Sequence, residues 1–189
     1  PDNSVTVRGT TPDIGNGTMI APAMFAKEEL DFDWSKVRSE IVPANRDLVE
    51  NDAYSKGGAL SYFSGRSTSE GKRLPVMQAA ASARERFLRA AAAKWGVEPA
   101  AVSIREGVVS AGSHSATLGE LAAEAAAVTL EAEPAPKPPE QWTFLGKAEP
   151  QRLHLPAILN ATAVYGIDVK VPGMVHAALR QVPVHGGRV

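Results

Sequence analysis

A long stretch of helix-forming residues in the middle of the chain constrains the fold more than any other feature. Between Leu74 and Trp95, apolar and small residues recur at three- and four-residue spacing, Pro75 stands at the start, and Gly96 follows as a C-cap. The residues expected to be buried are Val76, Ala80, Ala83, Phe87, Ala90 and Ala91; those expected to point mostly outward are Arg84, Glu85, Arg86 and Lys94. A helix with one apolar face needs other elements to cover it, so this segment predicts a domain assembled around it.

A second helix is predicted from Met19 to about Leu30, with Thr18 as its N-cap and Pro22 in its first turn. One face of this helix carries Met19, Ala23, Ala26 and Leu30, whereas Lys27, Glu28 and Asp31 fall elsewhere. The spacing therefore predicts an amphipathic helix.

Short strands are expected around both helices. Val5 and Val7 alternate in "SVTVRG", and "KVRSEIVPA" reads as a strand with Val37 and Ile41 inward. "AVSIREGVVSAG" predicts a β-hairpin that turns at Glu106–Gly107, and "SATLGELAAEAAA" predicts a short helix capped by Ser115 or Thr117. The fold class predicted is therefore α+β.

Three regions divide the chain by composition. Residues 1–130 hold the predicted α+β domain, which includes a polar stretch at 43–73 without sustained periodicity. Residues 131–156 form a proline-rich linker or strap, expected to be extended. Residues 157–189 contain two β-like runs around Pro172–Gly173. Because two strands do not make a stable fold alone, this end is expected to be the incomplete start of a second module.

Composition excludes several classes of function. The net charge is −1 and no long run of like charge occurs, so nothing indicates nucleic acid as a partner. No apolar run is long enough for a transmembrane segment, and the start of the chain lacks a signal-peptide pattern. The chain has no cysteine and its four histidines lack metal-site spacing, so no metal ligand is assigned. No pair of side chains suits acid–base or nucleophilic catalysis, so no catalytic residue is assigned either.

Two loops that precede the predicted helices are candidates for binding an anion. In the first, Gly15 and Gly17 flank Asn16, and the helix that follows presents backbone N–H groups. In the second, Gly65 and Arg66 precede Ser67, Thr68 and Ser69, which supply hydroxyl donors. The alternatives are a turn that merely starts a helix and a solvated loop with a helix cap.

The order of motifs resembles a known family. "DIGNGTMIAPAMFAKEELDFDWSKVRSEIVPA" resembles a segment of the molybdopterin-binding subunit in the xanthine dehydrogenase/aldehyde oxidase family, within the isoquinoline 1-oxidoreductase β-subunit and aldehyde dehydrogenase branch. The likeness continues through "GRSTSEGKRLPVMQAAASARERFLRAAAAKWGV", "SIREGVV" and "TLGELAAEAA". It ends in "FLGKAEPQRLHLPAILNATAVYGIDVKVPGMVHAALRQVPVHGGRV", which is similar to the start of the a/b-hammerhead domain.

The resemblance implies a fold, a cofactor and an activity. The fold would be a molybdenum-cofactor-binding-like domain (1–130), then the proline-rich strap, then the first hammerhead strands (157–189). The cofactor would be molybdopterin cytosine dinucleotide, with which family members hydroxylate aldehydes or N-heteroaromatics using oxygen from water. Its contacts would come from Gly15, Asn16 and Gly17 and from Gly65, Ser67, Thr68 and Ser69. The chain alone is expected to be inactive and to contribute cofactor binding, not the catalytic base.

The resemblance also implies partners. These are a ferredoxin-like small subunit with [2Fe–2S] clusters, the remainder of the molybdenum subunit or a companion large chain, and a cytochrome c as a candidate electron acceptor. A periplasmic location follows from the same branch; the other expectation is the cytoplasm. Asn16 replaces the family's usual glutamine, Arg66 a glycine, and Asn160–Ala161 the pair Thr–Gly. Asn16 and Arg66, together with the absence of the family's catalytic segment from these 189 residues, favour the alternative of a non-catalytic scaffold or degenerate paralogue that keeps the fold without binding cofactor.

Overall fold

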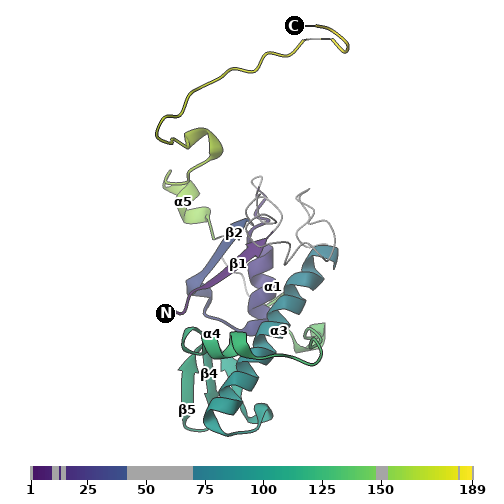
Figure 1. Cartoon of the computed structure of the whole chain (residues 1–189), viewed down its shortest axis with the longest axis vertical. Coiled ribbons are helices and arrows are strands. Elements are labelled where there is room, and N and C mark those ends of the chain that lie inside the picture. The colour runs from purple at the N-terminus through teal and green to yellow at the C-terminus, as the bar shows by residue number, and fades with distance from the viewer. Residues whose placement is uncertain are drawn as a thin grey trace. The chain divides into compact units, whose positions relative to one another are not determined.

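The computed structural model describes residues 2–9, 13, 16–41, 70–147, 153–182 and 184–188. It divides into two compact units, residues 1–153 and residues 154–189 (Figure 1). Most of the polar stretch predicted at 43–73 lies outside the described residues. The segment predicted as a linker belongs to the first unit as far as residue 153.

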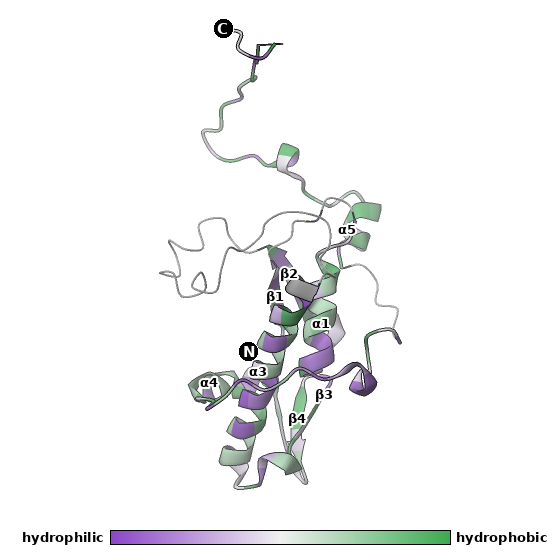
Figure 2. Ribbon diagram, turned by 90° about the vertical axis from the view of Figure 1, so that its right-hand side faces the viewer, coloured by the Kyte–Doolittle hydropathy of each residue, from purple (hydrophilic) through white to green (hydrophobic). Residues whose placement is uncertain are grey.

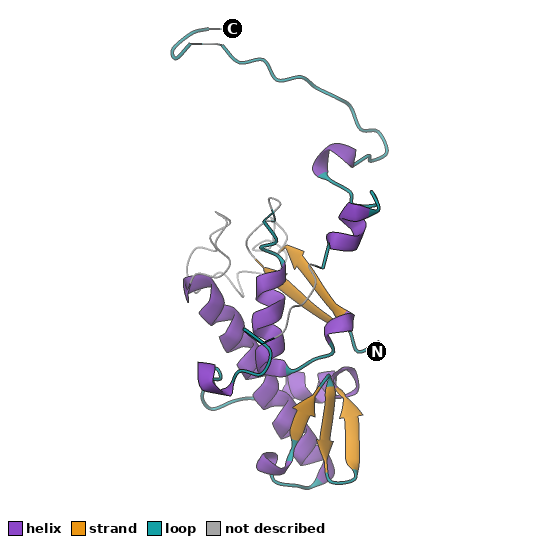
Figure 3. Cartoon of the chain, turned by 180° about the vertical axis from the view of Figure 1, so that it is seen from behind, coloured by secondary structure: helices purple, strands orange, loops and turns teal. Residues whose placement is uncertain are grey.

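The first unit is an α+β arrangement, as predicted. Its elements in chain order are β1 (Val5–Gly9), α1 (Ile20–Leu30), β2 (Val37–Ile41), α3 (Glu70–Trp95), β3 (Ser103–Arg105), β4 (Val108–Ala111), β5 (His114–Thr117) and α4 (Leu118–Ala127). β1 and β2 pair in parallel and are connected through α1, whereas β3, β4 and β5 form an antiparallel meander. Figure 3 shows α1 and α3 side by side, with the β1–β2 pair next to α1 and the meander next to α3.

The largest apolar cluster holds the two helices, the meander and α4 together. Leu30 and Phe32 at the end of α1 meet Ala91 of α3, Val109 of β4 and Leu121 of α4. Every one of these side chains is buried, and each comes from a different element or from a turn beside one. The core therefore forms only when segments far apart in the sequence assemble.

The long helix α3 begins at Glu70, one turn earlier than predicted, so Pro75 lies inside it. A proline this close to the start removes only one intrahelical hydrogen bond, which is why the helix tolerates it. The predicted C-cap is confirmed, because Gly96 has φ of 66° and the Val97 amide bonds back to the Ala92 carbonyl. Ala80, Ala90 and Ala91 are buried as predicted; Met77, Ala81 and Ala92, which the predicted face omitted, are also buried.

The prediction that α1 is amphipathic was wrong. Lys27, Glu28 and Glu29 are 4%, 1% and 0% exposed, because α3, the β1–β2 pair and residues 137–145 surround the helix. Figure 2 shows a hydrophilic (purple) part of the otherwise largely apolar α1. Thr18 is not the N-cap either: that position is Met19, whose side chain makes no capping hydrogen bond. Ile41, expected inward, is 46% exposed.

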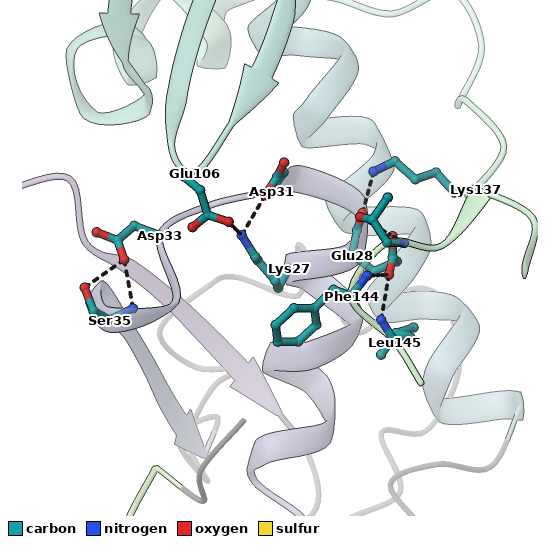
Figure 4. Close-up of polar contacts among 10 residues, drawn as sticks. Lys27, Glu28, Asp31, Asp33, Ser35, Glu106, Lys137, Phe144 and Leu145 are labelled. Atoms are coloured by element: carbon teal, nitrogen blue, oxygen red, sulfur yellow. Dashed lines mark hydrogen bonds and ion pairs between the residues drawn. The ribbon is translucent and has the colours of Figure 1, made fainter. Parts of the chain in front are cut away.

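The Glu28 carboxylate fixes a distant segment onto α1. It accepts three consecutive backbone N–H groups, from Thr143 at 2.9 Å and from Phe144 and Leu145 at 2.8 Å each (Figure 4). Burial by itself would raise the pKa of this carboxyl, but the three amide donors and the charge of Lys137 outweigh burial and hold the pKa below its ordinary value.

The neighbouring charges of α1 are also paired. The Glu29 carboxylate binds the Arg84 guanidinium of α3 and accepts the Lys137 amide at 2.8 Å. The Lys27 ammonium lies 2.6 Å from the Asp31 carboxylate and 2.5 Å from that of Glu106 (Figure 4). A buried charge is tolerated only when it is paired and hydrogen-bonded, so these partners explain why a charged helix can lie in the interior.

Gly107 joins the meander to the rest of the unit. The predicted hairpin turn is confirmed, with φ of 47° at Glu106 and 78° at Gly107. The Gly107 amide donates to the Asp31 carbonyl at 2.8 Å, and its carbonyl accepts the Leu118 amide at 3.0 Å. The glycine thus connects the end of α1 to the start of α4. The cap of α4 is Thr117, one of the two residues predicted; Ser115 lies in β5.

The second unit contains the short helix α5 (Leu155–Leu159) and a 3₁₀ turn at Gly166–Asp168. The turn predicted at Pro172–Gly173 is present, with φ of 75° at Gly173. The two β-like runs around it form no strand among residues 154–182 and 184–188, because a strand requires a hydrogen-bonding partner and the described part of this unit supplies none. Across the described parts of the chain, no helix is long and apolar enough to cross a membrane.

Replacing Gly107 with alanine should lower the free energy of unfolding by about 2–3 kcal/mol. A Cβ there would lie 3.1 Å from Asn3 Nδ2 and 3.3 Å from the Asp33 amide, in addition to the strain of a positive φ. Gly112→Ala is the matched control, since Gly112 also has positive φ but its Cβ would meet nothing within 4 Å. Urea unfolding should show that the control lowers the free energy of unfolding by about 1 kcal/mol. Equal losses in the two variants would contradict the close packing described at Gly107.

Glu28→Gln should destabilise the chain by about 3 kcal/mol at neutral pH, because an amide cannot accept all three backbone donors as a carboxylate does. The folded pKa of Glu28 lies below its ordinary value of 4.5, so its stabilising contribution is present above that value and is lost as pH falls through the folded pKa. When the free energy of unfolding is measured with urea from neutral to acid pH, it should fall less steeply with decreasing pH in the variant than in the wild type. The control is Glu124→Gln, which removes a charge from an exposed surface ion pair and should change the stability at neutral pH little. If the free energy of unfolding of Glu28→Gln depended on acid pH as that of the wild type does, the stabilising role of ionised Glu28 would be refuted.

Candidate functional site

The first candidate loop leads into α1. Gly17 has φ of 75°, the left-handed conformation expected there, and Asn16 is exposed beside it. The Gly17 amide donates to the Asp13 carboxylate at 3.2 Å, and the Gly17 carbonyl accepts the Ile20 amide at 3.1 Å. Gly15 lies outside the described residues. The loop therefore does start the helix, as the simpler interpretation held, and it also brings a residue without Cβ to the helix end.

The chemical groups at the N-terminal end of α1 suit a polar ligand. The side chain of the N-cap residue Met19 makes no capping hydrogen bond, and Pro22 in the first turn has no N–H to donate. The Met19 carbonyl at the start of the helix accepts the Ser39 hydroxyl of β2 at 2.6 Å. The partial positive charge of a helix N-terminus favours an anion, and glycine permits close approach. These features fit a group that carries phosphate and hydrogen-bonding atoms.

The second candidate loop, Gly65, Ser67, Thr68 and Ser69 with Arg66, lies outside the described residues. In the sequence it ends directly before α3, which begins at Glu70. The first described side chain after it is Arg73, whose guanidinium carbon lies 5.9 Å from the centre of the Trp142 ring. Among the described residues, Arg73 forms no ion pair with a carboxylate, and its other contact is a 3.6 Å approach to the Met77 sulfur.

Sequence reasoning missed Arg73. The signal that was available is a cation placed four residues after Ser69 and directly before the helix predicted from Leu74. An arginine there adds a planar set of donors suited to phosphate, next to hydroxyls suited to the same group. What the sequence did not show is that an aromatic ring from residue 142 holds it.

The N-terminal ends of α1 and α3 lie on the same side of the first unit. Ala21 and Phe25 of α1 pack with Met77 of α3, whereas Glu29, further along α1, pairs with Arg84, further along α3. The two helices therefore run in the same direction, and their N-terminal ends are neighbours (Figure 1). Gly17 stands just before one of these ends and Arg73 stands in the first turn of the other.

No chemistry beyond binding is apparent in the described residues. No group of three or more histidine, cysteine, aspartate or glutamate side chains in these parts of the chain could hold a metal ion. Glu28 and Glu29, the most buried carboxylates described, are engaged by backbone amides and by Arg84. They are therefore not available as a general base.

Comparison with known proteins identifies the family of the chain. The family model of the molybdopterin cofactor-binding domain matches residues 1–172. A membrane-bound aldehyde dehydrogenase [pyrroloquinoline-quinone] of Gluconacetobacter polyoxogenes is 31% identical over 99% of this chain and 24% of its own length. The β subunit of isoquinoline 1-oxidoreductase from Brevundimonas diminuta is 29% identical over 92% of this chain and 26% of its own.

A third relative, a nicotinate dehydrogenase subunit of Pseudomonas putida, is 27% identical over 92% of this chain and 14% of its own length. The chain thus spans about a quarter or less of each of these relatives. The match over residues 1–172 confirms the resemblance seen in the sequence: the chain belongs to the molybdopterin cofactor-binding domain family.

Proposed function

We propose that the chain forms part of the cofactor-binding side of a molybdenum hydroxylase subunit. The observation that carries this proposal is the left-handed Gly17 at the uncapped N-terminus of α1, inside the region that matches the family model. Gly15, Asn16 and Gly17 would meet the polar and phosphate groups of molybdopterin cytosine dinucleotide. Gly65, Ser67, Thr68 and Ser69 would meet them from the second loop, beside Arg73.

When bound, the cofactor supplies the hydroxylation of an aldehyde or an N-heteroaromatic compound with oxygen from water. The residues of this chain bind and orient it: glycine admits the ligand, helix N-terminal amides and hydroxyls donate to it, and Arg73 offsets its charge. The carboxylates of Glu28 and Glu29 are buried in structural contacts. This supports a contribution to cofactor binding and not to the catalytic base, with the chain inactive by itself.

The proposed assembly contains further chains. Two of the similar proteins are described as subunits, which supports partners here as well. Because this sequence has no cysteine, [2Fe–2S] clusters would belong to a ferredoxin-like small subunit. The rest of the molybdenum subunit, or a companion large chain, would provide the catalytic base, and a cytochrome c would accept electrons. A periplasmic location is part of the same proposal. Residues 157–189 would begin an a/b-hammerhead domain.

The rival function is a scaffold or assembly chain without cofactor, and one observation favours it. The Gly17 amide already has an anionic partner in the Asp13 carboxylate of the same loop. Because the Gly17 amide already donates to a carboxylate of the loop, it is not available to an external anion, and the charge of Asp13 would repel a phosphate placed there. The two functions therefore differ in whether molybdenum accompanies the native protein.

Gly17→Ala should reduce the molybdenum and cytidine monophosphate content of the purified native complex by roughly tenfold, a loss of ~1.4 kcal/mol in binding. A Cβ at φ of 75° strains the loop and stands where the ligand would approach. Gly96→Ala carries similar backbone strain at φ of 66°, at the far end of α3, and should leave both contents unchanged. Metal analysis and nucleotide release on the two variants measure this. A wild-type complex without molybdenum would establish the scaffold instead.

A further inference from the structure

Residues 134–145, the docked segment, lie against α1 and α3 and are held largely through their backbone. The Gln78 side-chain amide of α3 donates to the Pro134 carbonyl at 2.7 Å. The Glu29 carboxylate of α1 accepts the Lys137 amide at 2.8 Å. Side chains of the two helices therefore bind both carbonyl and N–H groups of this segment.

The Glu28 carboxylate adds charge-assisted contacts to the end of the docked segment. It accepts the backbone amides of residues 143–145 at 2.8–2.9 Å. Hydrogen bonds to an ionised group are roughly twice as strong as those between neutral groups. The Thr143 hydroxyl also approaches the carboxylate, but only to 3.4 Å. Because the short contacts involve backbone N–H groups, they do not depend on the side chains at these positions.

Large side chains of the docked segment supply apolar anchors. One set packs between the two helices in a small apolar group, the Trp142 cluster, which includes Ala21, Phe25, Met77, Trp142 and Leu145. The Phe144 ring lies 5.2 Å from that of Trp34, measured between ring centres. When a protein binds an extended peptide, backbone hydrogen bonds supply affinity and side-chain pockets supply specificity. The docked segment is held by the same two kinds of contact.

The larger apolar cluster does not include the docked segment. Among the described residues, every member of that cluster lies within residues 5–121. Removing the docked segment would leave this core complete, but it would take the backbone donors away from Glu28 and Glu29. Buried carboxylates without donors are costly, so the exposed face would favour return of the segment. The four prolines at positions 134–139 restrict the free segment and so lower the entropy lost on docking.

The chain just before the docked segment is accessible. Glu131, Ala132 and Glu133 are exposed, and the first two form a bend. Upstream of this bend, the Arg86 guanidinium of α3 donates to the Val128 carbonyl. The chain is therefore held on both sides of a short exposed connection, which is the kind of site where proteolytic cleavage is tolerated.

We propose that the face formed by α1 and α3 is a peptide-docking surface whose occupant is the chain's own docked segment, bound firmly enough to stay in place when the chain is cut at residues 131–133. The second unit, residues 154–189, follows the docked segment in the chain. Its attachment to the first unit therefore does not require an unbroken connection at the bend. This inference goes beyond the proposed function and does not depend on it, because the contacts that carry it involve no cofactor.

Cutting the folded chain tests the proposal directly. A protease recognition sequence inserted between Glu131 and Ala132 allows the full-length chain to be cut once after it has folded. The pieces, residues 1–131 and 132–189, should remain together in size-exclusion chromatography and native mass spectrometry at ~10 μM protein, which corresponds to a Kd of that order or tighter. Separation of the two pieces at this concentration would overturn the proposal.

Thr143→Pro and Thr143→Ala test whether the backbone is what the surface recognises. Thr143 is exposed, and Trp142 before it has φ of −68° and ψ of 130°, a conformation that permits a following proline. Proline removes the N–H donor together with the hydroxyl, whereas alanine removes the hydroxyl alone. In the cut chain, Thr143→Pro should raise the Kd between the pieces at least tenfold and Thr143→Ala less than threefold. Equal effects of the two substitutions would overturn backbone recognition.

Glu28→Gln tests the docking surface itself. In the cut chain it should raise the Kd about a hundredfold, because an amide replaces the carboxylate that accepts three backbone donors. Glu124→Gln, at an exposed surface pair, is the control and should leave the Kd unchanged. Circular dichroism of each uncut variant establishes that it is folded; if Glu28→Gln does not fold, the Thr143 variants decide, since Thr143 belongs to neither apolar cluster. A folded Glu28→Gln variant with the Kd of the wild type would overturn the proposal.

Discussion

The burial of Glu28 is the constraint on which the rest of the first unit depends. A carboxylate placed in an interior is tolerated only if strong donors replace the water that it loses. Three consecutive amides of residues 143–145 do so, and they reach it only when the chain beyond α4 returns across α1. The helix, its covering segment and the Trp142 cluster are therefore a single cooperative arrangement, because each lacks a partner without the others.

The other charges of α1 extend this arrangement to the remaining elements. Glu29 connects α1 to Arg84 in α3, and Lys27 connects it to Glu106 in the hairpin turn. Each pair joins segments that the apolar clusters also join, so hydrophobic burial supplies the driving force and the ion pairs restrict how the elements can fit. Gly107, beside Glu106, adds the backbone contact that places the meander at the end of α1.

This arrangement bears on the proposed cofactor site through the helix ends. α1 and α3 run side by side in the same direction, so both present N-terminal amides toward the same region. The buried acids lie further along α1, away from that end, and hold the segment that carries Trp142. The negative charges of Glu28 and Glu29, which would repel an anion, are thereby neutralised by structural contacts. The cation of Arg73 lies in the first turn of α3, against the Trp142 ring.

The sequence by itself determined the local elements and the family. Periodicity located α1 and α3, and local residue types indicated the Glu106–Gly107 turn and limited the α4 cap to Ser115 or Thr117, since these features depend on neighbouring residues. The order of motifs identified the family. Only the tertiary structure decided that Lys27, Glu28 and Glu29 are buried and that Trp142 faces Arg73. The donors that stabilise Glu28 lie more than a hundred residues away in the chain, and no helical spacing encodes a partner at that distance. For the same reason, the alternation near Pro172 indicated two β-like runs, but it could not show whether they pair. A strand forms only with a hydrogen-bonding partner, which residue spacing does not specify.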